Sequence, residues 1–344
     1  VQGACDMGCL PNVFPAYHNV ALDAPRANFE KAWGVKLPAK PGLTVVEMSK
    51  AAEEGKLKGL YCMGENMLLS DPDLHHLEKA LKKLDLFVVQ DIFLTETTEY
   101  AHVVLPAACF AEKGGTFTNT ERRVQRVRKA VEPPGEARTD WEIVADLSTR
   151  MGYPMNYAKP REIWTEIRQV TPSYAGITYE RISRQGLQWP CPNTDHPGTK
   201  YLHKDRFTRG LGLFTPIDFI PPAEVPDKDY PLYLTTGRVL YQYHTSTMTR
   251  RARGCNERYP EGLVEIHPKD ALKYGITDGR SVRVASRRGA VEAKASVTER
   301  SPEGTVFMTF HFHEARVNLI TNPAYDPGCK IPEYKVCAVK IDAA

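Results

Sequence analysis

Hydrophobic and polar positions in residues 43–105 alternate between strand-like and helix-like patterns. Apolar runs at residues 57–62, 86–89 and 103–105 have the length of buried strands. Between the first two runs, apolar residues recur at helical spacing: Leu74, Leu77, Ala80, Leu81 and Leu84. Strands that are separated by helical segments predict parallel βαβ units with right-handed crossovers.

The residues before Leu74 predict where this helix begins. Asp71 is expected to cap free N–H groups, and Pro72 fits the first helical position. Asp73 would then complement the positive end of the helix dipole.

Ligands of a parallel sheet bind beyond the carboxyl ends of its strands. Five residues are expected there: Gly64, Glu65, Asn66, Asp91 and Thr95. Gly64 would let a phosphate approach the backbone, and Asp91 could accept hydrogen bonds from guanine or ribose. The alternative is that these residues only make turns and caps, because the chain has no G-x-G-x-x-G pattern.

The second half of the chain changes character. Residues 139–183 predict helices and connections, and residues 185–229 are rich in Pro, Gly, Asp and Thr, as is typical of an irregular boundary segment. Beyond them a short helix is expected at 268–274, and short strands with Gly-bearing turns predict a small β-barrel. The strands are expected at residues 232–236, 264–266, 281–286, 291–297 and 305–310.

These patterns predict an α/β domain over residues 1–200, an irregular linker over 201–229 and a β-barrel domain over 230–344. No internal repeat or low-complexity segment interrupts this order.

Composition narrows the functional classes. The chain has 45 Lys and Arg against 42 Asp and Glu, a net charge of +3, which argues against a nucleic-acid binder that relies on bulk charge. The shares of hydrophobic (42%) and charged (25%) residues are those of a soluble globular protein. No apolar run approaches the ~20 residues that span a bilayer, so no membrane insertion is expected.

Eight cysteines are scattered along the chain, and the closest pair, Cys5 and Cys9, has C-x3-C spacing. This spacing is poor evidence for a zinc or iron–sulfur site, and scattered reduced thiols suit a cytoplasmic protein. The first residue is Val1. We therefore expect a processed or truncated chain whose beginning could have carried a targeting signal.

Seven segments, in this order, carry a family resemblance: residues 1–8, 89–93, 115–123, 139–141, 188–191, 235–238 and 332–335. Together they resemble the large subunit of formate dehydrogenases of the dimethyl-sulfoxide-reductase superfamily, along nearly the whole chain. The first and fifth segments resemble formate dehydrogenase more narrowly than the others do.

The resemblance implies two molybdopterin guanine dinucleotides around one Mo or W atom. They would be held by a Rossmann-like domain, built in this family from two separated stretches of chain, and by an aspartate-decarboxylase-like barrel. This chain would contain only part of that Rossmann-like domain.

The resemblance also assigns cofactor contacts. The strand-end residues would meet diphosphate, ribose and guanine, and the other contacts would be Thr118, Asn119, Glu121, Arg123, Arg238, Gln242, Tyr243, His244, Thr245, Phe310, Asn318, Tyr334 and Lys335. Arginine can bind phosphate or pterin carbonyl oxygens with both arms of its guanidinium group.

Several of these assignments have simpler alternatives. Arg122, Arg123, Arg126 and Arg128 could form a solvated charged face. Tyr241 and Tyr243 could be aromatic residues of the barrel rim. His311 and His313 have the spacing of a metal pair, but without a third ligand nearby such residues are more often strand-face residues.

In the resembled family, formate is oxidised to CO2 and two electrons pass to the metal. The Cys or selenocysteine ligand, its neighbouring His, the formate-orienting Arg and the [4Fe-4S] motif all match positions upstream of Val1. The chain alone is therefore expected to be inactive. Its expected partners are a complementary N-terminal polypeptide and iron–sulfur or electron-transfer subunits.

Two other functions stay open. One is another superfamily enzyme such as a nitrate reductase. The other is a non-catalytic module that binds nucleotide or serves as an electron-transfer scaffold, like the related subunit of respiratory complex I. An NAD dehydrogenase is least favoured, because the glycine fingerprint is absent.

Overall fold

The computed structural model describes all 344 residues, which form two compact units. Unit 1 contains Val1–Thr44 and Pro106–Ile217, and unit 2 contains Val45–Leu105 and Asp218–Ala344. Each unit is therefore built from two separated stretches of chain. The predicted domains, with boundaries at residues 200 and 230, are consecutive segments of the chain, whereas each compact unit combines two separated stretches. The domain boundaries stay a prediction.

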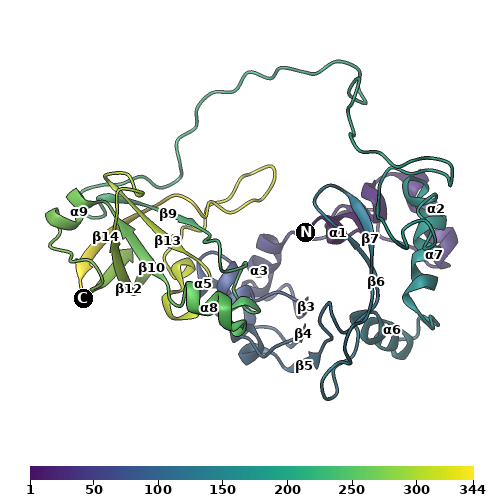
Figure 1. The fold of residues 1–344 in the computed structure, drawn as a ribbon, viewed down its shortest axis with the longest axis horizontal. Helices are drawn as coiled ribbons and strands as arrows, with labels where there is room; N and C mark the ends of the chain where they lie inside the picture. Colours follow the sequence, from purple (N-terminus) through teal and green to yellow (C-terminus); the bar gives the residue numbers. More distant parts are fainter. The chain divides into compact units, whose positions relative to one another are not determined.

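The first stretch of unit 2 is the predicted α/β part. Strands β3 (Gly59–Met63), β4 (Leu86–Asp91) and β5 (Val103–Pro106) form a sheet in that order, with β3 and β4 parallel. Helices α3 (Val45–Glu53) and α5 (Leu74–Leu81) pack against each other beside it (Figure 1). The predicted parallel α/β arrangement is confirmed, and the Rossmann-like partial domain that the resemblance implied is present.

The core of this part follows the predicted periodicity. The apolar face of α5 is buried because Leu74, Leu77, Ala80 and Leu81 recur on one side of the helix. They pack with Phe87 of β4, which has no exposed surface. Burying such a face contributes roughly 1.5–3 kcal/mol for each large side chain.

The predicted start of α5 was wrong. The helix begins at Leu74 after Asp73, whose backbone is left-handed (φ 47°) and whose side chain makes no capping hydrogen bond. Asp71 instead ends the short helix α4 (Met67–Ser70) and lies beside Ser70. The turn between the two helices takes up Pro72 and Asp73, so the carboxyl group of Asp71 is buried rather than free to cap.

The second stretch of unit 2 forms a closed barrel with the strand order β10-β12-β11-β14-β9-β13. The strands are β9 (Leu232–Gly237), β10 (Leu263–Ile266), β11 (Ser281–Ser286), β12 (Gly289–Val297), β13 (Thr305–Thr309) and β14 (Cys337–Ala343) (Figure 1). Helix α9 (Pro268–Lys273) follows β10. The predicted barrel and its short helix are confirmed.

One barrel strand was not predicted from the sequence. β14 (Cys337–Ala343) closes the barrel by pairing with β9 and β11. Cys337, Val339 and Ile341 alternate into the core with at most 2% exposure. Pairing on both sides covers hydrogen-bonding groups that would otherwise form two exposed sheet edges.

Unit 1 contains four α-helices and two small sheets. Its helices are α1 (Gln2–Asp6), α2 (Asp23–Trp33), α6 (Asp140–Arg150) and α7 (Pro160–Val170), which confirms the predicted helices in residues 139–183. Thr139 and Glu142 form a capping box at the start of α6.

Two small sheets complete unit 1. Strands β1 (Val13–Phe14) and β2 (His18–Asn19) pair antiparallel. β6 (Gly115–Thr118), β7 (Arg123–Val127) and β8 (Leu187–Gln188) form an antiparallel sheet that was not predicted. Its strands are two to five residues long, too short for a periodic pattern to be recognised.

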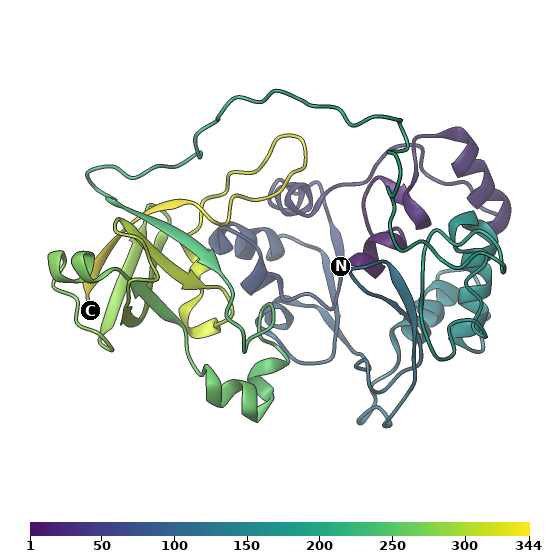
Figure 2. The same cartoon turned by 45° about the horizontal axis from the view of Figure 1, so that its top comes forward.

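Short helical turns connect these elements: η1 (Pro15–Tyr17), η2 (Glu96–Tyr100), η3 (Pro172–Tyr174), η4 (Thr249–Arg251), α8 (Arg253–Arg258), η5 (His313–Ala315) and η6 (Val317–Leu319). From Gln188 to Leu232 the chain forms neither helix nor strand, and this irregular segment is the long teal connection in Figure 2. None of the helices has the length and apolar character that crossing a membrane requires.

Candidate functional site

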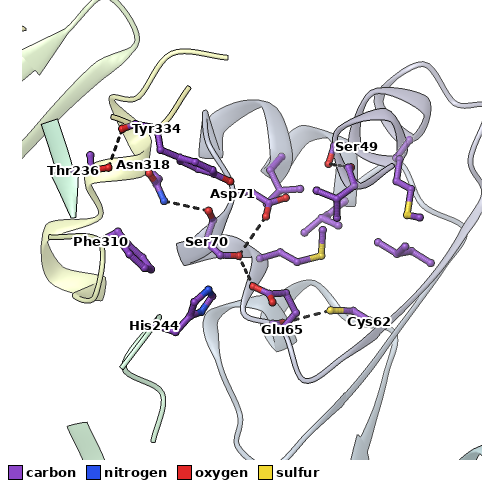
Figure 3. Close-up of a pocket in the computed structure, with 18 of the residues that line it drawn as sticks. Ser49, Cys62, Glu65, Ser70, Asp71, Thr236, His244, Phe310, Asn318 and Tyr334 are labelled. Atoms are coloured by element: carbon purple, nitrogen blue, oxygen red, sulfur yellow. Dashed lines mark hydrogen bonds between the residues drawn. The ribbon is translucent and has the colours of Figure 1, made fainter. Parts of the chain in front are cut away.

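A pocket of about 440 Å³ lies within unit 2, between the α/β part and the barrel (Figure 3). Its apolar lining comes mainly from α3 and α5 and the strand beside them: Val45, Met48, Ala52, Leu60, Met67, Leu77, Ala80 and Leu81. Its lining also includes seven of the predicted cofactor contacts: Glu65, Arg238, His244, Phe310, Asn318, Tyr334 and Lys335. The fold thus brings together residues that lie up to 270 positions apart in the chain.

One side of the pocket carries two carboxyl groups. The Ser70 hydroxyl donates to Glu65 Oε1 at 2.5 Å and lies 3.3 Å from Asp71 Oδ1 (Figure 3). Gly64 turns the chain after β3 with φ +65°, which places Glu65 at the strand end. Burial, and then the nearby charge of Glu65, raises the pKa of Asp71 from 3.8 to about 7.

This raised pKa makes the stability of unit 2 depend on pH. Because the folded chain binds the Asp71 proton more tightly than the unfolded chain, the stabilisation is complete below pH 4 and is lost as pH rises through about 7. We expect Asp71→Asn to remove about 2 kcal/mol of the loss in unfolding free energy between pH 5 and pH 8. Pulse proteolysis along a urea series at both pH values measures it.

Tyr334 and Glu65 also face Asp71, and a Glu65 variant separates the effect of the Glu65 charge on the pKa of Asp71 from the effect of burial. Glu65→Gln should lower the pKa of Asp71 but leave part of the pH dependence, since burial is the larger cause. An Asp71→Asn chain that loses as much stability as the parent between the two pH values would show that another group is responsible.

The opposite side of the pocket is cationic and aromatic. Arg238 follows β9 and lies over the Phe310 ring at 5.0 Å from its centre, and the His244 ring meets the edge of Phe310 at 5.5 Å. Lys335 Nζ donates to the backbone oxygen of Thr236 at 3.5 Å. Neither Arg238 nor Lys335 forms a salt bridge, so both cations are available to an anionic ligand.

Tyr334 connects the two sides. Its ring extends from the barrel toward Asp71, while its backbone oxygen accepts from Thr236 Oγ1 at 2.8 Å (Figure 3). Burial and the charges of Asp71 and Glu65 raise the pKa of Tyr334. The phenol is therefore neutral and can donate a hydrogen bond.

The side-chain amides of two predicted cofactor contacts, Asn318 and Asn66, form hydrogen bonds to other residues of the protein. Asn318 donates to the backbone oxygen of Leu69 at 2.7 Å and so links the barrel to α4. Asn66 donates to Glu96 at 2.7 Å and accepts from Thr97 at 2.8 Å. The amides of both residues hold together the loops that line the pockets.

A second pocket of unit 2, about 420 Å³, is lined by three further predicted contacts, Asn66, Thr95 and Thr245. Arg250 and Arg251 also line it. The Thr95 hydroxyl is buried and has no hydrogen-bond partner in the protein. A buried polar group without a partner is uncommon in proteins and fits a position that a ligand completes.

Four predicted contacts of unit 2 lie outside both pockets. Gly64 makes the turn after β3, and Asp91 ends β4 and accepts from the Ile92 N–H at 2.6 Å. Burial raises the pKa of Asp91. Gln242 is buried with its amide bonded to Tyr259 and Thr249, whereas Tyr243 is 78% exposed.

Four more predicted contacts, Thr118, Asn119, Glu121 and Arg123, belong to the β6–β7 hairpin of unit 1. Arg123 Nε donates to Glu121 at 2.6 Å, and this hydrogen bond lowers the pKa of Glu121 to about 2. Their role toward a cofactor stays a proposal.

The arginines of this hairpin are not simply a solvated face. Arg122, Arg123 and Arg128 donate to backbone oxygens in the stretch between Ser183 and Lys200. Arg126 lies over the Tyr179 ring at 3.9 Å. These side chains fasten the irregular segment around β8 to the hairpin.

Residues that could hold a metal ion do not cluster in the structure. His311 accepts from the Val239 N–H at 3.0 Å and contacts the His244 backbone oxygen, while His313 lies 3.1 Å from Glu96. No group of three His, Cys, Asp or Glu side chains has the geometry of a metal site. All eight cysteines are free thiols.

The sequence analysis missed Ser70, Asp71 and Thr236 as pocket residues. Asp71 was interpreted as a helix cap because Asp-Pro-Asp before a periodic segment is typical of helix starts. Thr236 lay inside a predicted strand, where its hydroxyl carried no separate signal. Only the packing of the barrel against the α/β part shows that both face one pocket.

Comparison with known proteins places the chain in a family. The family "Molybdopterin oxidoreductase" matches residues 2–150, and "Molydopterin dinucleotide binding domain" matches residues 232–338. The chain is 56% identical to the F420-dependent formate dehydrogenase subunit alpha of Methanocaldococcus jannaschii over 99% of its length and 51% of that protein. It is 40% identical to formate dehydrogenase H of Escherichia coli, again over 99% of the chain and 49% of that protein.

More distant proteins show how far the likeness extends. The chain is 39% identical to the assimilatory nitrate reductase catalytic subunit of Bacillus subtilis, over 99% of the chain and 50% of that protein. The solved structure of acetylene hydratase from Pelobacter acetylenicus shares the fold with a TM-score of 0.70 at 19% identity, over 94% of this chain and 50% of that one. The chain spans about half the length of the curated relatives it matches. It belongs to the molybdopterin oxidoreductases, and its matched segments cover both the α/β part and the barrel.

Proposed function

We propose that this chain binds molybdopterin guanine dinucleotide as part of a formate dehydrogenase. One observation carries the proposal: the unit 2 pocket sets two cations that form no salt bridge, Arg238 and Lys335, against two carboxyl groups that form none, Glu65 and Asp71. A ligand with both anionic and N–H-rich ends is complementary to such a lining.

The donor set fits the chemical parts of this cofactor. Arg238 and Lys335 would meet diphosphate or pterin carbonyl oxygens, and Phe310 offers a ring face to a planar heterocycle. Glu65 or Asp71 would accept the amino and ring N–H groups of pterin or guanine. The unpartnered Thr95 hydroxyl in the second pocket would find its acceptor or donor on the same ligand.

The bound cofactor would supply a Mo or W centre that takes two electrons from formate, which leaves CO2 and a proton. This chain's residues would hold the cofactor arms and set the charge around them. The apolar wall from α3 and α5 would exclude water from one side of the pocket.

The remaining parts of the enzyme are proposed from the relatives. We propose a complementary N-terminal polypeptide that supplies the metal ligand, the formate-orienting arginine and the [4Fe-4S] cluster, so that this chain alone is inactive. The printed names of relatives at 51–56% identity describe alpha subunits of F420-dependent formate dehydrogenases. We therefore propose electron-transfer subunits that pass electrons to F420.

The test is to purify the native enzyme that contains this chain and to measure its metal content, its nucleotide content and its activity. Metal analysis should find Mo or W, and acid hydrolysis should release GMP. In an activity assay, the enzyme should reduce a viologen dye with electrons from formate. Activity with nitrate but not formate would favour the nitrate reductase alternative, since the chain is also 39% identical to an assimilatory nitrate reductase catalytic subunit. Absence of both metal and GMP would refute the cofactor site and favour a scaffold.

A further inference from the structure

Unit 1 contains a basic pocket of about 600 Å³ that the proposed cofactor site does not use. It lies between the β6–β7 hairpin and the starts of α6 and α7. Six cations line it, Lys113, Arg126, Lys129, Arg138, Lys159 and Arg161, together with three acids, Glu112, Glu132 and Glu142. Three further acids, Asp140, Asp146 and Glu180, pair with cations of this lining.

Two of these cations have no acidic partner. Lys113, Lys129, Arg138 and Arg161 form salt bridges with neighbouring carboxylates. Arg126 and Lys159 contact no carboxylate, although both face the same pocket. The positive charge of the pocket is therefore concentrated at these two residues.

Buried polar atoms at the pocket wall also lack partners. Tyr179 is 8% exposed, and its hydroxyl has no hydrogen bond. The guanidinium group of Arg126 stacks on its ring at 3.9 Å, and Arg126 Nε is buried and unpartnered as well. Buried polar groups are normally satisfied, so these two atoms of the pocket wall lack a partner that the chain itself supplies.

The start of α7 adds a third feature. Lys159 precedes the helix without a side-chain cap, and Pro160 and Arg161 follow it at the pocket wall. Glu162, the acid of the first turn, is turned back onto the Ala158 N–H at 2.8 Å. The start of this 11-residue helix therefore has no side-chain cap, whereas the start of α6 is closed by its capping box.

We propose that this pocket binds a phosphate group, either free or carried by a nucleotide. An arginine fork, a lysine charge and a helix N-terminus are the elements that recognise phosphate in proteins. The site belongs to unit 1 alone and does not depend on the proposed cofactor function.

The test is isothermal titration of the full 344-residue chain with inorganic phosphate and with AMP, at matched ionic strength against sodium chloride. Arg126→Met should weaken phosphate binding about tenfold or more, and Lys159→Ala about threefold. Lys159 is exposed, so its variant keeps the test valid if Arg126→Met fails to fold. Arg184→Met and Lys31→Ala, which change exposed cations of unit 1 outside the pocket, should leave the affinity unchanged.

The two titrants identify the source of the phosphate. Tighter binding of AMP than of inorganic phosphate would support a nucleotide, and equal binding would support free phosphate. The proposal is overturned if neither titrant gives a saturable signal above chloride. It is also overturned if the pocket variants bind as tightly as the two control variants.

Discussion

Replacing Arg238 by methionine should lower the affinity of the chain for molybdopterin guanine dinucleotide by about 10- to 100-fold. Arg238 lies at the end of β9 over Phe310, and its guanidinium group forms no salt bridge in the protein. Methionine keeps a long apolar side chain on the aromatic ring but removes every hydrogen-bond donor. The change therefore tests the charge and donors of Arg238 rather than its packing.

The measurement is the GMP released per chain after purification of the parent and variant enzymes under the same conditions. Arg280→Met is the matched control, because Arg280 is an exposed barrel arginine outside the pocket. Equal GMP content in the Arg238 variant and the parent would remove Arg238 from the proposed site. A loss in the control variant as well would point to damage to the barrel.

The second large effect concerns the barrel core. Leu234→Ala should lower the unfolding free energy of unit 2 by about 3 kcal/mol, within the 2–5 kcal/mol range for buried leucines. Leu234 has no exposed surface and lies opposite Val306 on β13 and Cys337 on β14. Truncation leaves a cavity at the point where the closing strand β14 joins β9.

The four tryptophans all belong to unit 1, so their fluorescence does not report on the barrel. Hydrogen exchange of peptides from β9, β13 and β14 measures the effect directly. Leu272→Ala is the matched control, since Leu272 is 84% exposed on α9 and should cost less than about 0.5 kcal/mol. Unchanged exchange in the Leu234 variant would contradict a single packed barrel core.

Two residues that line the unit 2 pocket were predicted as cofactor contacts, Glu65 from its place at a strand end and Arg238 from the family resemblance. Glu65 follows β3 and Arg238 follows β9, positions where side chains leave the sheet and face a ligand. The resemblance also assigned Gln242 to the cofactor, and its amide is bonded to Tyr259 and Thr249 inside the barrel loop. Sequence position shows that a polar group is near a site but not which hydrogen bonds it has already made.

Asp71 shows the opposite case. Its sequence context is that of a helix cap, whereas the fold buries it beside Glu65 and raises its pKa to about 7. Burial and the neighbouring charge come from residues on other elements, so no local pattern could indicate them.

The sequence by itself determined the α/β part and most barrel strands, because each rests on a local period of apolar residues, and it indicated that residues 139–183 are helical and connecting. Tertiary structure alone decided where α5 begins, that β14 closes the barrel and that β6, β7 and β8 pair. It also decided which carboxyl groups and cations remain without salt-bridge partners in the two pockets on which the proposals rest. These features depend on contacts between residues far apart in the chain, and such contacts leave no periodic trace in the sequence.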